Sequence, residues 1–411
     1  YFFATTIILA EESLVLTYFE DDQARVSSYV GDVLLKYNIK EETILGKQAA
    51  SLGEAFAWGK QLNSAWVESH LPKHAIMATT VDDTRKQAAI YNGVLENEEV
   101  RAEVKAAVGN MFSPSTLEIY AQCPFRFLGE RIWKQSEFVE KEELAAPTDM
   151  GTLVHECLAK FLGKHLQEKL PKYDFAVLWE DLKQEFQNLC DEYIANGKLL
   201  QNELWGAEQK RLLNMLHKWL RYEYDMQGKW DFVPCAVEWA FNNKEGAPLR
   251  LKLEDGQKFA IMGRVDRIDK NGNKVFVTDY KLGSVPAVDD LPNGVDLQLP
   301  IYLLAANKLY GKEVAGGGYL SMKEGKRKNN VKLDVSQEFP FMDKRSKDHF
   351  VNIEDRWLAF KEGSEKLLCS YVQGIYDGNF NVQQMKKCNS YCALRDICRL
   401  NTVELGGEDD E

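Results

Sequence analysis

The sequence lacks an excess of positive charge. Its 411 residues include 51 Lys and Arg against 63 Asp and Glu, which gives a formal net charge of -12. A surface of this average sign repels phosphate, so the composition excludes a protein that coats nucleic acid by general electrostatic attraction. Binding of DNA would require a local basic groove or bound cations. Hydrophobic residues make up 45% of the chain, which excludes wholesale disorder.

The sequence also lacks an apolar run of about 18 residues, which a transmembrane helix requires. The apolar opening at residues 1–10 has no basic leader and stops at Glu11, so it is too short to cross a bilayer and does not begin like a signal peptide. Because the first residue is Tyr1 and not Met, we expect the chain to be a piece of a longer protein. We expect that protein to be soluble and cytoplasmic, without membrane contact.

Cysteine is too scarce for a disulfide scaffold, because the chain has 8 and three of them fall within its last 24 residues. The closely spaced Cys388, Cys392 and Cys398 could bring three thiolates to one metal centre. Cys123, which lies in a short motif of its own, is the best candidate for a fourth ligand. Four thiolates suit either zinc or an iron–sulfur cluster. The remaining cysteines are expected to be small core residues: Cys157, Cys190, Cys235 and Cys369.

A change of hydrophobic period divides the chain. Residues 1–110 begin with a strand-like stretch at 13–19 and then become helical and charged. Pro114 marks a break, where Ser113 or Ser115 is suited to cap the next helix. Helical spacing over 115–230 then gives way to a period of two. We expect strands over 249–253, 258–262 and 274–281, and a helix over 297–310 closed by Gly311. No complete Walker A pattern occurs.

Two acidic residues fall on neighbouring predicted strands. If these strands pair around a turn at Asn271, Asp266 lies opposite Val277, and Asp279 lies one diagonal step away on the same face. Two close carboxylates repel each other unless a cation lies between them. The spacing therefore predicts a site for a divalent metal such as magnesium, which prefers oxygen ligands.

Lys281 continues the face of Asp279, whereas Tyr280 points the other way. A lysine beside such a metal site could orient an attacking water or neutralise charge that develops on a phosphate. The pattern Asp-x-Lys is not specific by itself, because a solvated strand edge in a charged protein also produces it.

Two further features support a functional site. His155 lies off the apolar stripe of its predicted helix, and the small residues Gly151 and Ala159 one turn away on either side leave room for a metal or a phosphate. Gln298 and Tyr302 share one face near a helix start. A single helix histidine is often structural or exposed, so these features gain meaning only in combination.

In combination, the motifs resemble the RecB/AddB-type nucleases of the PD-(D/E)xK superfamily, in particular the iron–sulfur-containing nuclease domain of AddB-like helicase–nuclease subunits. The resemblance extends from about Ser113 to Cys398. The matching pieces are Cys123-Pro124-Phe125-Arg126-Phe127, Gly151-x3-His155, Gly263-Arg264-Val265-Asp266-Arg267-Ile268-Asp269, Asp279-Tyr280-Lys281, Gln298-x3-Tyr302 and the terminal cysteines.

The resemblance implies an α/β fold with a restriction-endonuclease-like core, in which helices flank a mixed β-sheet and a four-cysteine cluster clasps the two ends of the domain. It implies the following roles: His155, Asp266, Asp279 and the backbone carbonyl of Tyr280 as ligands of Mg2+ or Mn2+, Lys281 as the catalytic lysine, Gln298 and Tyr302 as residues that hold the DNA strand, and Cys123, Cys388, Cys392 and Cys398 as ligands of a structural [4Fe–4S] cluster. Three residues separate Cys388 from Cys392, where the commoner form has two, which keeps zinc as an alternative.

The resemblance also implies a domain organisation and an activity. Residues 1–110 would be a remnant of a helicase-like module with its linker, residues 111–400 the nuclease domain, and residues 401–411 an acidic tail. The expected activity is metal-dependent hydrolysis of DNA by an exonuclease that acts on a single strand or a duplex end. A helicase partner subunit and a role in double-strand break repair and recombination are expected with it.

A basic run offers a candidate surface for the DNA backbone, with a solvated loop as an equal alternative. Its residues are Lys323, Lys326, Arg327, Lys328, Lys344, Arg345 and Lys347. Two other functions remain open for the whole chain: a catalytically inactive DNA-binding or scaffold module that keeps the fold, and an interaction module with a structural zinc site.

Overall fold

The chain divides into two compact units, Tyr1–Thr79 and Thr80–Glu411. The computed structural model describes residues 93–135, 147–199, 203–244, 246–342 and 355–382, together with residues 392, 394 and 398. All of these belong to the second unit, which is described by itself below. The strand predicted over residues 13–19 and the acidic tail lie outside the described residues.

A mixed five-stranded sheet runs through this unit in the order β2-β5-β6-β7-β8. Neighbouring strands are antiparallel except β6 and β7, which are parallel. A parallel pair needs a crossover connection, which helix α12 (Gln298–Tyr310) provides. The strands are β2 (Val233–Phe241), β5 (Gly263–Asn271), β6 (Lys274–Lys281), β7 (Glu313–Ser321) and β8 (Lys326–Lys332). The prediction of a mixed sheet flanked by helices is confirmed.

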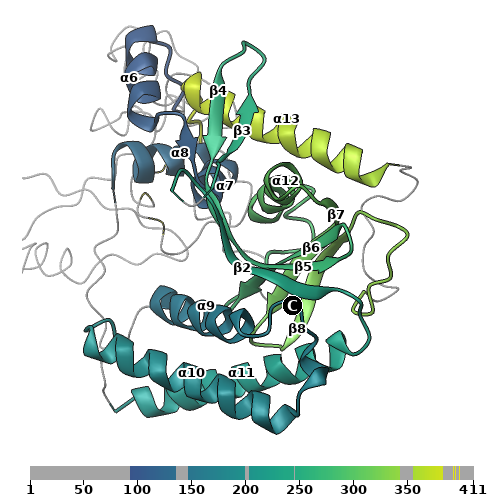
Figure 1. Ribbon diagram of the computed structural model, residues 1–411. Coiled ribbons are helices and arrows are strands. Elements are labelled where there is room, and N and C mark those ends of the chain that lie inside the picture. The colour runs from purple at the N-terminus through teal and green to yellow at the C-terminus, as the bar shows by residue number, and fades with distance from the viewer. Residues whose placement is uncertain are drawn as a thin grey trace, which may run out of the picture. The chain divides into compact units, whose positions relative to one another are not determined.

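Helices cover both faces of this sheet (Figure 1). Helices α9 (Pro147–Gly163), α10 (Phe175–Ala195) and α11 (Trp205–Gln227) pack on one face, and α12 and α13 (Arg356–Tyr376) lie on the other. The first described helices are α6 (Glu98–Val108), α7 (Pro114–Gln122) and α8 (Pro124–Phe127), followed by a π-helical turn, Leu128–Ile132. A short 3-10 turn, Leu170–Lys172, joins α9 to α10.

A second, three-stranded sheet lies above α12 in the view of Figure 1, in the order β1-β4-β3. Strand β1 (Met111–Phe112) pairs parallel with β4 (Lys258–Ile261), which pairs antiparallel with β3 (Leu249–Lys252). The predicted strands over 249–253 and 258–262 correspond to β3 and β4. This sheet joins the start of the predicted nuclease domain to its middle.

Local sequence explains several of the element ends. The hydroxyl of Ser113 accepts the backbone N–H of Thr116 at 3.2 Å, and Pro114 occupies the first turn of α7, so the predicted cap is confirmed. Helix α12 ends at Gly311, whose φ of 69° is readily adopted only by a residue without a side chain.

The hairpin between β5 and β6 has a different register from the predicted one. Ile268, not Asp266, lies opposite Val277, because the two-residue turn is Gly272-Asn273 and not Asn271-Gly272. Gly272 has a φ of 58°, as such a tight turn requires. The register shift is two residues, an even number, so every side chain keeps its predicted face of the hairpin.

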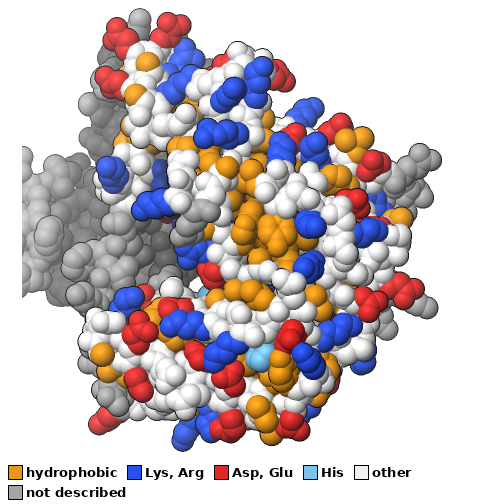
Figure 2. Space-filling view, viewed as in Figure 1, with side chains coloured by type: hydrophobic (Ala, Val, Ile, Leu, Met, Phe, Trp, Pro, Cys, Tyr) orange, Lys and Arg blue, Asp and Glu red, His pale blue; other side chains and the backbone are white. Residues whose placement is uncertain are grey.

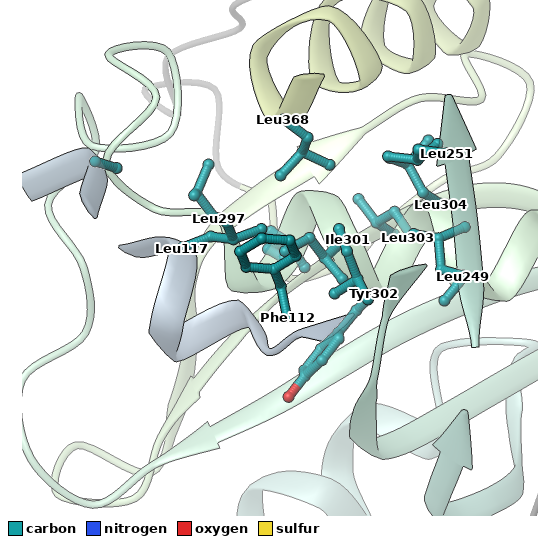
Figure 3. Close-up of a cluster of buried hydrophobic side chains, with 14 of the residues drawn as sticks. Phe112, Leu117, Leu249, Leu251, Leu297, Ile301, Tyr302, Leu303, Leu304 and Leu368 are labelled. Atoms are coloured by element: carbon teal, nitrogen blue, oxygen red, sulfur yellow. The ribbon is translucent and has the colours of Figure 1, made fainter. Parts of the chain in front are cut away.

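Two apolar cores hold the layers together. The core on the α12 side joins α7, α12 and α13 to both sheets, and Figure 3 shows Leu117, Leu297, Ile301 and Leu368 converging there from three helices and a loop. The core on the other side joins α9, α10 and α11 to the sheet. Cys157 and Cys190 are fully buried within this second core, which confirms their predicted role as small core residues.

A group of four charged residues is buried between α11 and the central sheet, and we call it the arginine network: Glu223, Arg267, Asp269 and Arg327. Arg267 lies 2.8 Å from both carboxylates, and Arg327 lies 3.5 Å from Glu223. Arg327 also donates to the hydroxyl of Thr278 at 2.6 Å, and the ring of Trp230 lies 5.1 Å from its guanidinium carbon. Two positive and two negative charges therefore balance in the interior.

The surface carries charges of both signs. Figure 2 shows lysine and arginine side chains interspersed with acidic ones on the visible face. The predicted basic surface is wrong for Arg327, which is buried in the arginine network, while Lys326 and Lys328 both pair with Glu324. The second part of that run, residues 344–347, lies outside the described residues. None of the described helices combines the length and the apolar character needed to cross a membrane.

Candidate metal centre

Strands β5 and β6 separate at the two predicted acidic residues. Their pairing stops at Arg267 opposite Thr278, one residue short of Asp266 and Asp279. The carboxylate of Asp266 takes the place of the missing ladder contact, since its Oδ2 accepts the backbone N–H of Tyr280 at 2.8 Å. Both acids are buried, with 9% of Asp266 and 1% of Asp279 exposed. The opening of the hairpin therefore holds two carboxylates away from bulk water.

Helix α9 brings His155 to this opening. Its Nδ1 lies 3.4 Å from Oδ1 of Asp266, and its Nε2 lies 3.1 Å from the carbonyl oxygen of Tyr280. Burial favours the neutral imidazole, but the hydrogen bond and charge of Asp266 outweigh it and raise the pKa of His155 to about 9. Without a metal, the histidine is therefore protonated at neutral pH, and metal ligation would release that proton.

Lys281 forms an ion pair with Asp279, with Nζ 2.9 Å from Oδ2. Burial and the neighbouring charge of Asp266 raise the pKa of Asp279 above its ordinary value, so its negative charge is only partly compensated. Burial alone would lower the pKa of Lys281, but the charge of Asp279 and its hydrogen bond raise it, which keeps the ammonium charged. No described residue donates a hydrogen bond to Oδ1 of Asp279.

Gln298 and Tyr302 continue the chain of contacts from the lysine. Lys281 donates to Oε1 of Gln298 at 2.6 Å, and Nε2 of Gln298 lies 3.0 Å from the hydroxyl of Tyr302. Figure 3 shows the ring of Tyr302 among the core residues, with its hydroxyl directed away from the labelled leucines. Tyr302 is only 5% exposed, so this geometry favours positioning of Lys281 over direct contact with DNA.

The structure adds Glu238, which the sequence reasoning missed. Glu238 lies on β2 directly across from Asp266, between the pairs Val237–Arg267 and Trp239–Val265. Ligand atoms of His155, Glu238 and Asp266 all lie within 4.8 Å of one another. Burial and the charge of Asp266 raise the pKa of the Glu238 carboxyl. Its place as the one charged residue of an otherwise apolar strand was a usable sequence signal.

The backbone of Glu238 is strained. Its φ of 48° lies in the left-handed region, which is unfavourable for a residue with a side chain inside a strand. Such strain persists only where the surrounding structure imposes it, and it is concentrated at functional sites. Here the strained residue directs a carboxylate at Asp266 and His155.

These residues, His155, Glu238, Asp266, Asp279 and Lys281, are called the acidic site below. Carboxylate and carbonyl oxygens with one imidazole form a donor set that suits Mg2+ or Mn2+ better than a soft metal. The unsatisfied Oδ1 of Asp279, deep inside the protein, is the observation that fits a cation best, because a buried carboxylate oxygen without a donor is unfavourable. The residues present therefore fit a divalent cation.

The cysteines are described in part. Cys123 lies between α7 and α8, and Cys392 and Cys398 are described in the C-terminal segment, whereas Cys388 lies outside the described residues. Leu394, which lies between two of the terminal cysteines and is 1% exposed, packs so closely on Gly129 that a side chain there would collide with it. Leu394 therefore lies beside the turn that follows the Cys123 motif.

Comparison with known families gives one extended match. The sequence model of the PD-(D/E)XK nuclease superfamily matches residues 111–399, which cover most of the chain and all of the acidic site.

Several curated relatives are named as a subunit of an ATP-dependent helicase/deoxyribonuclease. The protein from Carboxydothermus hydrogenoformans is 30% identical over 264 residues, which are 61% of this chain and 23% of the relative. The one from Clostridioides difficile is 28% identical over 262 residues (59% and 22%), and that from Clostridium tetani 26% over 321 residues (72% and 25%). The chain thus spans about a quarter of the length of these relatives.

Proposed function

Because this chain belongs to the PD-(D/E)XK nuclease superfamily, we propose that it is a divalent-metal-dependent nuclease that hydrolyses DNA phosphodiester bonds. The observation that carries the proposal is the convergence of His155, Asp266, Asp279 and Lys281 from three separate elements on the opening between β5 and β6. A catalytically inactive module would have no need to keep a buried, incompletely compensated carboxylate beside a charged lysine.

Four groups would hold Mg2+ or Mn2+: the carboxylates of Asp266 and Asp279, the imidazole of His155 and the carbonyl oxygen of Tyr280. Glu238 offers a further carboxylate on the same side. When bound, such a cation polarises a phosphate oxygen and lowers the pKa of an attacking water. The protonated imidazole has one N–H toward Asp266 and another toward the Tyr280 carbonyl, and His155 would enter the ligand set by losing one of these two protons.

Lys281 would act on the reacting groups. Its ammonium is held by Asp279 and Gln298, which leaves a proton available to donate to a phosphate oxygen or to an attacking water. A charged donor fixed in a poorly hydrated site stabilises the charge that develops on the phosphate without having to reorganise. Gln298 and Tyr302 would keep the ammonium at this point.

The proposed subunit, partner and biological process rest on the similarity to the curated relatives. We propose that the chain is the nuclease part of an AddB-like subunit that works with a helicase partner on a DNA single strand or duplex end, in double-strand break repair and recombination. The relatives' name, which joins a helicase with a deoxyribonuclease, supports this assignment. Residues 1–110 would be a remnant of the helicase-like module, and residues 111–400 the nuclease domain.

A [4Fe–4S] cluster held by Cys123, Cys388, Cys392 and Cys398 is proposed as a structural clasp, with zinc as the alternative. The packing of Leu394 on Gly129 supports it, because Leu394 lies between Cys392 and Cys398 in the sequence and Gly129 lies close after Cys123. Anaerobically purified protein should be brown, contain iron, and lose its visible absorption with Cys123→Ser. A colourless protein with stoichiometric zinc would establish zinc in its place.

Cleavage of labelled single-stranded and duplex-ended DNA tests the proposed function. With Mn2+ or Mg2+ the wild type should degrade DNA, and Lys281→Ala should lower the rate by about 10²- to 10³-fold, as expected when one preorganised charge donor is lost. Lys164→Ala, which removes a lysine bound to Asp181 on the surface, should leave the rate unchanged. Equal rates for the wild type and Lys281→Ala would contradict the catalytic assignment.

A further inference from the structure

The start of helix α12 is capped only in part by the adjoining chain, where the carboxylate of Asp296 accepts the N–H of Leu299. The residue at its N-cap position is Leu297, whose side chain makes no capping hydrogen bond, and Leu297 and Leu299 are both completely buried. The first N–H groups of a helix have no partner within the helix, and leaving them unsatisfied in a buried position is unfavourable. The N–H groups of Leu297 and Gln298 therefore need an acceptor from elsewhere.

Glu118 of helix α7 provides that acceptor. One carboxylate oxygen, Oε1, accepts the N–H of Leu297 at 3.1 Å and the N–H of Gln298 at 3.0 Å. Glu118 is thus a helix cap from almost 180 residues away in the sequence. Apolar packing of Leu117 beside Leu297 holds α7 against the start of α12 (Figure 3).

The residue capped by Glu118 is also the residue that holds the lysine. Gln298 is the first residue of α12, and its side-chain Oε1 accepts from Lys281 at 2.6 Å. Lys281 in turn is paired with Asp279. A continuous set of contacts thus runs from Glu118 through the backbone and side chain of Gln298 to Lys281.

We propose that Glu118 is a positioning residue: it fixes the start of α12 so that Gln298 holds Lys281 at the acidic site. The inference rests on the proposed nuclease function for its consequence in catalysis, but the capping itself does not depend on that function. The acting group is a single oxygen at a set distance, and the negative charge of Glu118 is not needed for it.

Three variants of Glu118 separate the contribution of its oxygen from that of its negative charge. Glu118→Gln keeps an oxygen at the same reach and removes the charge. Glu118→Asp keeps the charge and withdraws the oxygen by one methylene, and Glu118→Ala removes both. The matched control is Asp355→Ala, because Asp355 caps α13 by accepting the N–H of Leu358 at 2.8 Å and lies outside the acidic site.

Two measurements on the full chain do not need nuclease activity. Hydrogen exchange of a peptide that contains Leu297 and Gln298 should be accelerated by Glu118→Ala and Glu118→Asp but not by Glu118→Gln or Asp355→Ala. Acylation of Lys281 by a small amine-reactive reagent, measured by peptide mass spectrometry, should also become faster in Glu118→Ala and Glu118→Asp. Unchanged exchange and acylation in Glu118→Ala would overturn the proposal.

The catalytic consequence is read from the rate of DNA cleavage. Glu118→Ala and Glu118→Asp should lower kcat by about tenfold to a hundredfold, as expected from a small misplacement of a catalytic group, while Glu118→Gln restores it. Adding Glu118→Ala to Gln298→Ala should cause no further loss. Full additivity of the two, or an impaired Glu118→Gln, would overturn the positioning role. If the wild type itself cuts no DNA, the proposed function fails. The hydrogen-exchange and acylation results still test whether Glu118 caps α12 and positions Lys281.

Discussion

Strands β5 and β6 take part in two clusters of buried charge, and the two clusters are built differently. In the arginine network, two carboxylates meet two guanidinium groups at distances of 2.8–3.8 Å. In the acidic site, three carboxylates meet the imidazole of His155, the ammonium of Lys281 and the exposed guanidinium of Arg264, which lies 3.5 Å from Glu238. In the first cluster both carboxylates are held by buried guanidinium groups, whereas the second leaves Oδ1 of Asp279 without a hydrogen-bond donor among the described residues.

The two clusters are adjacent along the chain. Arg267 follows Asp266, and Thr278 and Tyr280 lie on either side of Asp279. Arg267 lies 3.3 Å from the hydroxyl of Tyr280, and Arg327 donates to Thr278. Because neighbouring strand residues point to opposite sides, the arginine network anchors the backbone from which the acidic residues project. The arginine network therefore supports the fold, whereas the acidic site keeps an oxygen of Asp279 open to a cation.

The largest effect is expected from the arginine network. Arg267→Met leaves the carboxylates of Glu223 and Asp269 buried with one guanidinium fewer, and this should lower the free energy of unfolding by about 3–5 kcal/mol. The control is Arg211→Met, which removes a surface pair with Glu208 and should cost at most about 1 kcal/mol. Chemical denaturation measures both, and equal losses would contradict a special role for the network.

In the acidic site, by contrast, replacing a buried carboxylate should raise the free energy of unfolding. The pKa of Asp279 is raised by burial and by Asp266, so its ionised form opposes folding in the metal-free protein. At pH 8, Asp279→Asn should therefore raise the free energy of unfolding by about 1 kcal/mol or more. The gain should shrink as the pH falls through about 7, the pKa of Asp279 in the folded protein, and should be lost below about 3, where the carboxyl is protonated in both states. Denaturation across this pH range checks it, and a destabilised variant at pH 8 would contradict the account.

The smallest effect concerns the strain at Glu238. Glu238→Gly relieves the left-handed backbone and should raise the free energy of unfolding by up to about 1 kcal/mol while it weakens Mn2+ binding by about tenfold. Gln167→Gly is the control, because Gln167 has a φ of 65° and lies outside the acidic site. It should give a similar gain in stability with unchanged Mn2+ affinity. Unchanged affinity in Glu238→Gly would remove Glu238 from the ligand set.

The sequence predicts best what is local or periodic. The alternation of β6 places Asp279 and Lys281 on one side and Tyr280 on the other whatever the register. The hairpin register was wrong by two residues because two neighbouring dipeptides, Asn271-Gly272 and Gly272-Asn273, are both suitable turns.

The features that the sequence does not predict depend on long-range contacts or on the alternation of side chains along a strand. Glu118 caps a helix almost 180 residues away, and no local pattern reports such a contact. The run of cations predicts a basic surface that includes Arg327, yet on a strand its side chain points away from those of Lys326 and Lys328 and into the interior. Glu238 is recognisable as an acid in an apolar strand, but only β2 pairing shows that it faces Asp266.

The central claim is that the acidic site, and not the arginine network, binds the divalent cation. Calorimetric titration of Mn2+ into the wild type, Asp279→Asn and Glu223→Gln, each below its melting temperature, tests it most directly. The account predicts equal affinity for the wild type and Glu223→Gln, and binding at least about tenfold weaker, a loss of about 1.4 kcal/mol or more, for Asp279→Asn. Unchanged Mn2+ affinity in Asp279→Asn would contradict it.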